Sequence, residues 1–164
     1  MIPVIKFNNK FYPEFQAHGN AAQFALPYAK YFCQGEGVDV GCNRLEWCYP
    51  GAKPIDPSIN EFDALNIPYT NLDYIFSSHC LEHVANWVDV LNYWSTKLAP
   101  GGIIFLYLPD YSQEYWRPWN NRKHIHILTP QILTDYFNAN NFNLVFASGI
   151  DLNNSFMVVA QRSK

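Results

Sequence analysis

Residues 37–43 read Gly37-Val38-Asp39-Val40-Gly41-Cys42-Asn43, a short β-branched run that a glycine closes. The run is typical of a buried strand, and Gly41 suits a tight turn because it has no Cβ. A strand that leads through a glycine turn into a helix commonly holds nucleotide-type ligands, with an acid on the next strand binding a ribose hydroxyl. Asp56 stands at the end of such a second strand. The stretch therefore predicts a ligand site between Gly41 and Asp56.

The glycine motif is incomplete, so a second interpretation stays open. A dinucleotide fingerprint carries three glycines, and Asn43 stands where the second of them would fall. Asparagine tolerates a positive φ better than most residues, so the turn can still form. Taken alone, the stretch is also compatible with an ordinary strand followed by a turn.

Length and composition indicate one folded domain, residues 1–164. Hydrophobic residues make up 49% of the chain, which supplies enough apolar material for one core. Charged residues make up only 15%, which argues against disorder and is compatible with self-association, so we expect a monomer or a homodimer. The net charge of −3 argues against a nucleic-acid partner, because that affinity comes mainly from clustered Lys and Arg. A small-molecule substrate fits better.

Cysteine usage and hydropathy indicate the cellular setting. The four cysteines form no C-x-x-C pair, and the chain begins without a charged and then apolar export signal. No apolar run approaches the roughly 18 residues needed to cross a bilayer. The sequence therefore predicts a reduced, soluble, cytoplasmic protein with no membrane partner.

The first half predicts an arm followed by alternating helices and strands. Residues 1–19 suggest an extended arm that packs by its aromatic side chains, and Asn20 is placed to cap a helix that ends near Phe32. This arm and helix make up residues 1–34. The elements expected next are a strand ending at Gly41, about two turns of helix within 43–49, a strand at 52–56 and a strand at 72–77.

The second half continues the alternation and ends with two strands. The elements expected there are an amphipathic helix over 80–98, a strand at 103–108, a helix from Thr129-Pro130 to about Asn140, and strands at 144–148 and 156–161. The last two strands are joined closely enough to pair antiparallel. Residues 109–129 form a polar, aromatic excursion that we expect to cover the substrate. The order predicts a mostly parallel sheet under helices, with a ligand beyond the carboxyl ends of its strands.

Five segments, taken in order, resemble the motifs of a known family. They are Val38-Asp39-Val40-Gly41-Cys42, Asp56, Asp63-Ala64-Leu65-Asn66-Ile67-Pro68, Phe76-Ser77-Ser78-His79-Cys80-Leu81-Glu82-His83 and Leu98-Ala99-Pro100-Gly101-Gly102. Together they are similar to the class I S-adenosylmethionine-dependent methyltransferases, and most of all to the small methyltransferase-11-like group. The resemblance spans residues 35–161, and its most specific part is the fourth segment followed by Pro100-Gly101-Gly102.

The resemblance implies a fold and a cofactor. The fold would be a three-layer, Rossmann-like α/β architecture with a mostly parallel sheet and an antiparallel last strand, and the cofactor would be S-adenosylmethionine. Only a short segment separates Asp56 from Asp63, where the family has a whole helix and strand. We therefore expect the third strand and its preceding helix to be missing or vestigial, which leaves about six strands.

The resemblance also implies cofactor-binding residues by position. They are Asp39 and Gly41 beside the methionine part, the backbone of Cys42 and Asn43 close to it, Asp56 at the ribose, Asp63 and Ala64 at the adenine, and Ser78 and His79 near the sulfonium.

The excursion supplies the candidate catalytic residues. Methyl transfer mainly requires alignment and the exclusion of water, but a hydroxyl acceptor benefits from a general base. His124 and His126 share a face if their segment is extended, so one of them is the candidate base. Asp110 follows the central strand and is a candidate substrate contact. Solvated loop histidines and a turn-forming Asp110 are the simpler alternatives. Residues 121–130 also resemble members associated with sugar pathways, so the acceptor would be a small molecule, such as a sugar or nucleotide-sugar, methylated at oxygen or nitrogen.

Two other functions stay open. His79-Cys80-Leu81-Glu82-His83 fits the His-x-x-Glu-His pattern of zinc hydrolases, in which both histidines bind zinc and the glutamate is the base. That pattern needs a third ligand on a later helix, where only Asp135 is offered, so we expect no metal site. The incomplete glycine motif is compatible with a methyltransferase-fold binding module without catalysis.

Overall fold

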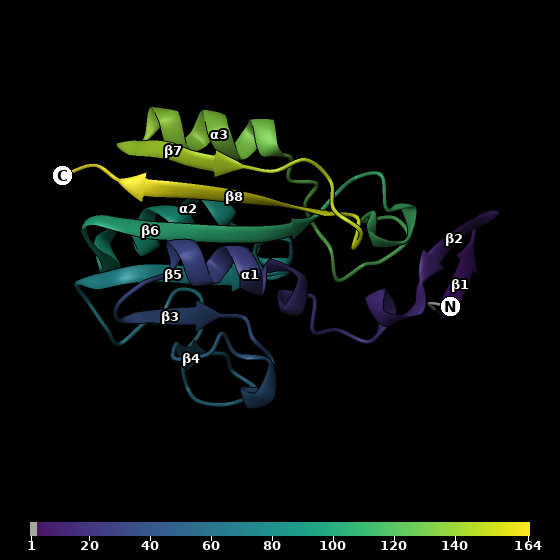
Figure 1. Cartoon of the computed structure of the whole chain (residues 1–164), viewed down its shortest axis with the longest axis horizontal. Coiled ribbons are helices and arrows are strands. Elements are labelled where there is room, and N and C mark those ends of the chain that lie inside the picture. Colours follow the sequence, from purple (N-terminus) through teal and green to yellow (C-terminus); the bar gives the residue numbers. More distant parts are fainter. Residues whose placement is uncertain (1–2) are drawn as a thin grey trace.

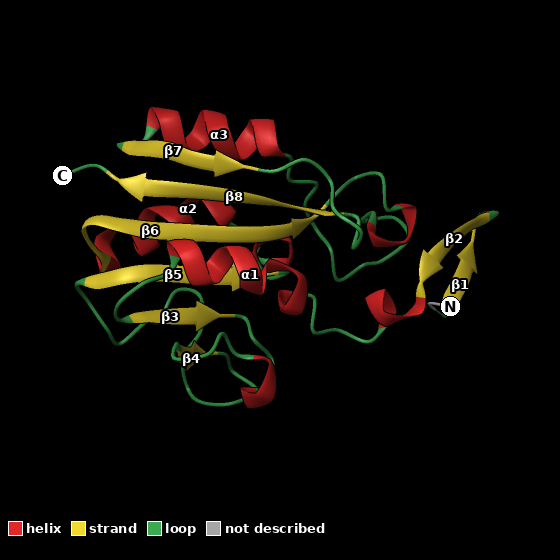
Figure 2. Ribbon diagram, viewed as in Figure 1, coloured by secondary structure: helices red, strands yellow, loops and turns green. Residues whose placement is uncertain are grey.

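A computed structural model describes residues 3–164, in which six strands form one sheet between two layers of helices (Figures 1 and 2). The strand order is β4-β3-β5-β6-β8-β7. The strands of this sheet are β3 (Gly37–Val40), β4 (Lys53–Ile55), β5 (Leu72–Ser78), β6 (Leu98–Pro109), β7 (Phe142–Ala147) and β8 (Ser155–Arg162). The helices are α1 (Ala22–Phe32), α2 (Trp87–Lys97) and α3 (Pro130–Ala139).

The strand directions confirm the predicted class of sheet. β3 pairs in parallel with β4 and β5, and β5 pairs in parallel with β6. β8 runs antiparallel to both β6 and β7. The described segment from Asp56 to Asn71 contains no helix and no named strand, so β4 is an edge strand. The expected loss of one strand and one helix is therefore confirmed.

Helices cover both faces of the sheet and divide the core in two. α1 packs on one face, where Ala25 and Ala29 meet the aromatic side chains of β5 and β6. α2 and α3 cover the opposite face, and Trp94 and Leu133 lie fully buried there. β6 is apolar toward both layers, as its sequence predicts, because the centre of a parallel sheet is covered on both sides.

The start of α3 follows the sequence, but that of α1 does not. Thr129 caps α3 through its side chain, which accepts a hydrogen bond from the Ile132 amide at 3.2 Å. The prediction that Asn20 caps the first helix is wrong: α1 begins at Ala22 without a side-chain cap. Asn20 instead has a φ of +58°, which belongs to a left-handed turn and not to an N-cap.

Two predicted helices are shorter than expected. Within 43–49 there is only a 3₁₀ turn, η2 (Leu45–Trp47), because Arg44 before it is extended. The helix expected over 80–98 is also wrong in its first part, where a 3₁₀ turn, η3 (Leu81–His83), precedes α2. The backbone carbonyl of Glu82 accepts hydrogen bonds from Ile125 and His126, so it is not available to a helix.

The N-terminal arm is a hairpin and not simply an extended chain. β1 (Val4–Phe7) and β2 (Lys10–Pro13) pair antiparallel, and the hairpin projects from the body of the molecule beside the carboxyl ends of the parallel strands (Figure 1). A short 3₁₀ helix, η1 (Glu14–Ala17), connects it toward α1. The hairpin packs on the excursion through an edge contact between Phe7 and Tyr115 and an ion pair between Lys10 and Glu114. Two distant segments thus meet at the ligand end of the sheet.

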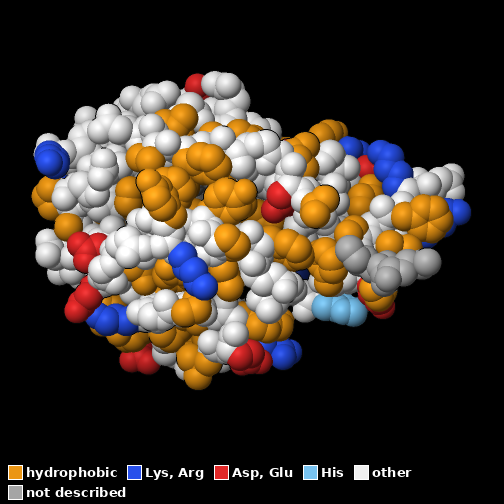
Figure 3. Space-filling model, in the orientation of Figure 1, with side chains coloured by type: hydrophobic (Ala, Val, Ile, Leu, Met, Phe, Trp, Pro, Cys, Tyr) orange, Lys and Arg blue, Asp and Glu red, His pale blue; other side chains and the backbone are white. Residues whose placement is uncertain are grey.

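The surface over α1 is rich in apolar side chains. Figure 3 shows many hydrophobic and few charged side chains on this face. Tyr28 and Tyr31 of α1 are 45% and 78% exposed. Within residues 3–164 we find no helix with the length and hydropathy required of a membrane span.

Candidate cofactor and acceptor site

A cavity of about 600 Å³ lies where the sequence places the ligand, at the carboxyl ends of β3, β4 and β5. Residues following these three strands form its floor. Residues 15–22 before and within α1, together with residues 115–124 of the excursion, form its walls. The expected cover by the excursion is thus joined by a second wall that the sequence did not predict.

The turn after β3 is built on two left-handed residues. Gly41 has a φ of +87° and Asn43 a φ of +62°. The Gly41 amide donates to the Ile55 carbonyl at 2.9 Å, which fixes the turn against β4. A Cβ at Gly41 would lie only 2.5 Å from the Cys80 side chain. Asn43 therefore supplies the conformation that a second glycine would have given, and the turn forms without the full motif.

Asp56 is buried at the end of β4 and organises the loops around it. One carboxylate oxygen accepts from the Asn43 amide at 2.7 Å, and the other accepts from the Ser58 amide at 2.8 Å. Each oxygen has two lone pairs, so each can still accept a hydroxyl hydrogen from a ligand. The side chain lines the cavity with both loops held in place.

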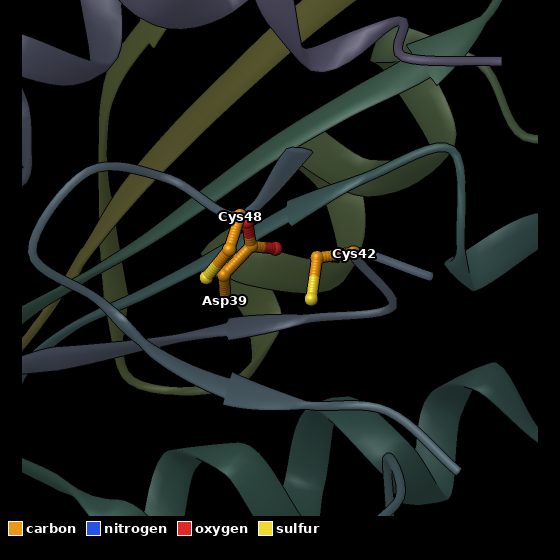
Figure 4. A group of neighbouring side chains, drawn as sticks. All are labelled: Asp39, Cys42 and Cys48. Atoms are coloured by element: carbon orange, nitrogen blue, oxygen red, sulfur yellow. The ribbon is translucent and has the colours of Figure 1, made fainter. Parts of the chain in front are cut away.

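Asp39 is the second cavity carboxyl group, and it is almost fully buried. It accepts a hydrogen bond from the Tyr49 amide at 2.6 Å. Burial raises the pKa of Asp39 to about 7, because a charged carboxylate is poorly solvated there. Figure 4 shows its carboxyl group between Cys42 and Cys48. A hydrogen bond with Cys48, followed by burial, raises the pKa of the Cys42 thiol, which therefore stays protonated.

Ser78 and His79 form the wall after β5. The hydroxyl oxygen of Ser78 is buried and has no hydrogen-bond partner within residues 3–164. His79 adopts a φ of +48° and directs its ring toward Trp116, with ring centroids 4.9 Å apart. Burial is the main cause that lowers the pKa of His79 to about 3, so the ring is neutral. Ser78 thus lines the cavity, but its hydroxyl oxygen is shielded within the wall.

The three candidate catalytic residues all line a small second pocket, and His124, which is buried, also lines the main cavity. Asp110 accepts from the Ser112 amide at 2.8 Å, which is the turn-forming role that the sequence left open. The ring of His126 contacts the Ala85 carbonyl at 2.9 Å. Only His124 also reaches the main cavity, so it is the candidate base nearer the ligand site, and the catalytic role of either histidine stays a prediction.

The two residues expected at the adenine lie outside the described cavity wall. Asp63 is exposed and accepts from the Leu65 amide at 2.7 Å. The carbonyl of Ala64 accepts from the Trp94 indole at 2.8 Å. The remaining seven positions implied for the cofactor all line the cavity: Asp39, Gly41, Cys42, Asn43, Asp56, Ser78 and His79.

Several cavity residues had no role in the site predicted from the sequence. Residues 15–22 reach the cavity only because the arm folds back over the sheet end. His83 also lines the cavity, and Glu82 is buried directly beneath it. The histidine-glutamate motif was a signal for these two residues, but its partner His124 comes from a segment that only tertiary folding brings close.

The mostly parallel α/β sheet, with Asp39 in its first strand, a glycine turn at Gly41 and Asp56 after the next strand, defines a protein of the Rossmann-like class. Residues 17–146 match the family model of a methyltransferase domain. The chain belongs to the class I S-adenosylmethionine-dependent methyltransferase family. None of the curated proteins matches it.

Solved structures share this fold at low sequence identity. A putative methyltransferase from Haloferax volcanii, solved with the Trm112 methyltransferase activator, is 11% identical with a TM-score of 0.69, over 92% of both chains. A possible histamine N-methyltransferase from Thermotoga maritima is 17% identical with a TM-score of 0.65, also over 92% of both chains. The N-methyltransferase NodS from Bradyrhizobium japonicum, solved with S-adenosylhomocysteine, is 15% identical with a TM-score of 0.62 over 92% of this chain and 89% of that one.

Proposed function

We propose that the protein transfers a methyl group from S-adenosylmethionine to a small-molecule acceptor at oxygen or nitrogen. The observation that carries this proposal is the cavity wall made by Asp39, Gly41 and Asp56 at the ends of adjacent parallel strands. Two carboxyl groups suit the ammonium and ribose hydroxyls of the cofactor. The residues present therefore fit this cofactor.

The chain's part in the reaction would be to align the acceptor and exclude water. When bound, S-adenosylmethionine supplies an electrophilic methyl group on a sulfonium. Trp116 is buried between the rings of His79 and His124 and closes the cavity from the side of the excursion. Burial is the first cause that lowers the pKa of His124 to about 4, so its ring is neutral but is a weak base near pH 7.

The acceptor that fits best is small and polar. A cavity of about 600 Å³ accommodates a nucleoside cofactor with limited room beside it. Asn121 and Lys123 lie on its wall and provide an amide and a cation for a polar or anionic acceptor. A sugar or nucleotide-sugar meets both conditions. The net charge of −3 gives no support to a nucleic-acid acceptor.

Isothermal titration calorimetry with S-adenosylhomocysteine tests the cofactor assignment. We expect one site per chain with a dissociation constant of about 1–100 μM, and no heat with NAD, which lacks the amino-acid part. The absence of binding at millimolar S-adenosylhomocysteine would overturn the proposal. Transfer is tested separately with methyl-labelled cofactor and a panel of sugars, nucleotide-sugars and amines, since a binding module would retain the cofactor and label none of them.

Asp39 makes the predicted cofactor affinity dependent on pH. Its pKa is about 7, so the carboxylate that would pair with the cofactor's ammonium group forms as the pH rises through neutrality. The ammonium itself stays largely protonated up to about pH 7.5. We therefore expect S-adenosylhomocysteine to bind roughly five- to tenfold more tightly at pH 7.5 than at pH 6. Calorimetry of Asp39→Asn should give weaker binding with a flat profile, and an equally steep profile in that variant would contradict the assignment.

A further inference from the structure

A second group of side chains, which we call the Glu82 cluster, lies in the cavity wall away from the Asp39 and Asp56 carboxyls. It comprises Glu82, His83 and His124, whose ligating atoms lie within 4.8 Å of one another. His79 approaches from the other side, with its Nδ1 3.8 Å from Glu82 Oε1, and His83 Nε2 lies 3.7 Å from the same oxygen. Three imidazoles thus surround one carboxyl group.

Glu82 has no structural role that accounts for its burial. The side chain is 1% exposed, and neither carboxylate oxygen has a hydrogen-bond partner in the described chain. A buried carboxyl group without donors is strongly unfavourable, so proteins normally pair it or place a cation against it. The three neighbouring histidines would be the obvious donors, and their hydrogen bonds show which ring nitrogens carry protons.

His83 and His79 each use their ring proton on the side away from Glu82. His83 Nδ1 lies 2.6 Å from the Lys123 carbonyl, which only accepts, so Nδ1 is protonated and Nε2 presents a lone pair to Glu82. The Ser155 hydroxyl donates to the Asn153 carbonyl at 3.1 Å, so it accepts from His79 Nε2 at 2.9 Å. His79 Nδ1 therefore also presents a lone pair to Glu82.

His124 adds a third imidazole beside Glu82. Its Nδ1 is buried and has no hydrogen-bond partner in residues 3–164. His83 and His79 each donate outward through one ring nitrogen while the second nitrogen faces Glu82, and this is the usual arrangement of metal-ligating histidines. The cluster therefore directs ring lone pairs toward a buried carboxyl group. Burial raises the pKa of Glu82 to about 8, because no described residue beside the carboxylate compensates its charge.

The backbone around the cluster is fixed by hydrogen bonds. The amides of Ile125 and His126 donate to the Glu82 carbonyl at 3.0 and 3.2 Å. These bonds, with that between the His83 ring and Lys123, dock residues 121–126 onto η3. The cluster is thus preorganised, which favours ligand binding because little ordering remains to be done.

We propose that Glu82, His83 and His124 bind a divalent transition-metal ion, with Zn²⁺ as the best match and His79 as a further available ligand. Two imidazoles and one carboxylate are a known zinc donor set that leaves a position open, whereas Mg²⁺ and Ca²⁺ prefer oxygen ligands alone. The sequence predicted no metal site because only folding brings His124 to His83. Glu82 is a ligand here and not the base of a hydrolase.

The open position would face the cavity, because His79, His83 and His124 all line it. An ion there would bind a hydroxyl, carboxylate or phosphate oxygen of the acceptor and would lower the pKa of a bound hydroxyl, which the weakly basic His124 cannot deprotonate efficiently. This substrate class, an acceptor with a metal-binding oxygen, rests on the proposed function. The metal site itself does not.

Calorimetry with ZnCl₂ on the metal-free full chain tests the site. We expect one Zn²⁺ per chain, weak or no binding of MgCl₂, and a loss of at least about tenfold in Zn²⁺ affinity in Glu82→Gln and in His124→Asn. His126→Ala is the matched control, since this histidine lies two residues away and faces the Ala85 carbonyl; it should retain the affinity. Visible absorption of the Co²⁺ form, which reports on the ligands directly, should change in Glu82→Gln and stay unchanged in His126→Ala.

Three results would overturn the proposed metal site. No Zn²⁺ binding by the wild-type chain, or unchanged affinity in Glu82→Gln, would overturn the proposal. Zn²⁺ binding that is lost in Cys48→Ser but kept in Glu82→Gln would also overturn it, because the ion would then sit at Asp39, Cys42 and Cys48. Titration of each variant with S-adenosylhomocysteine separates the two proposals. Binding of Zn²⁺ without binding of the cofactor would refute the proposed function alone. Binding of the cofactor without binding of Zn²⁺ would refute only the metal site.

Discussion

Asp56→Asn should weaken S-adenosylhomocysteine binding by about 30-fold or more, because hydrogen bonds from ligand hydroxyls to a carboxylate are stronger than those to a neutral amide. The substitution also disturbs the site before any ligand binds. Asp56 accepts from the Asn43 and Ser58 amides, and an amide NH₂ in place of one oxygen would face one of these donors. The turn after β3 would then lose its contact with the end of β4.

Calorimetry measures this effect, with Asp135→Asn as the matched control. Asp135 is a residue of α3 whose oxygen accepts from Gln131, and it lies outside the cavity wall. The control should bind S-adenosylhomocysteine as the wild type does. If Asp56→Asn bound within about twofold of the wild type while remaining folded, Asp56 would not be the ribose ligand.

Gly41→Ala should destabilise the protein strongly for so small a substitution. The new Cβ would lie 2.5 Å from both Cβ and Sγ of Cys80, and the backbone at φ +87° is unfavourable for alanine. The left-handed conformation costs about 1–2 kcal/mol and the overpacking about 1–3 kcal/mol. We expect a loss of about 3 kcal/mol in the free energy of unfolding, together with loss of cofactor binding because the turn must move.

Gly51→Ala separates the two contributions. Gly51 has a φ of +91°, close to that of Gly41, but a Cβ added there would meet no atom within 4 Å. This variant should lose only the conformational part, about 1–2 kcal/mol, and should retain S-adenosylhomocysteine binding. Thermal or urea unfolding of both variants gives the comparison. Equal destabilisation would show that contact with Cys80 does not constrain the turn, and normal cofactor binding by Gly41→Ala would place the cofactor elsewhere.

The elements that the sequence predicted correctly are those with a strong local pattern. β6 is an unbroken apolar run, and Thr129-Pro130 carries both a capping hydroxyl and a residue preorganised for the first helical turn. The wrong boundaries occur where tertiary contacts compete with local preference. Residues 80–86 have helical spacing of apolar side chains, yet the docking of residues 121–126 takes the Glu82 carbonyl out of any helix.

The site divides in the same way. The part of the cavity that we propose for the cofactor follows strands and turns that are consecutive in the chain. Asp39, Gly41, Cys42, Asn43 and Asp56 accordingly line one cavity, and their binding role stays a prediction. The part that we propose for the acceptor is assembled from the arm, η3 and the excursion, which are far apart in the sequence. No local pattern could indicate that His124 turns inward to His83 while His126 turns away to the Ala85 carbonyl.

By itself, the sequence determined the class of fold, the shortened edge of the sheet and the crevice at its strand ends. Periodicity and turn residues are enough for these features, because each strand and turn is selected by its own side chains. Only the tertiary structure decided which polar groups share the cavity. Glu82 and Ser78 are buried without hydrogen-bond partners among the described residues. Whether a polar group is buried and paired depends on every segment packed around it, and those segments come together only on folding.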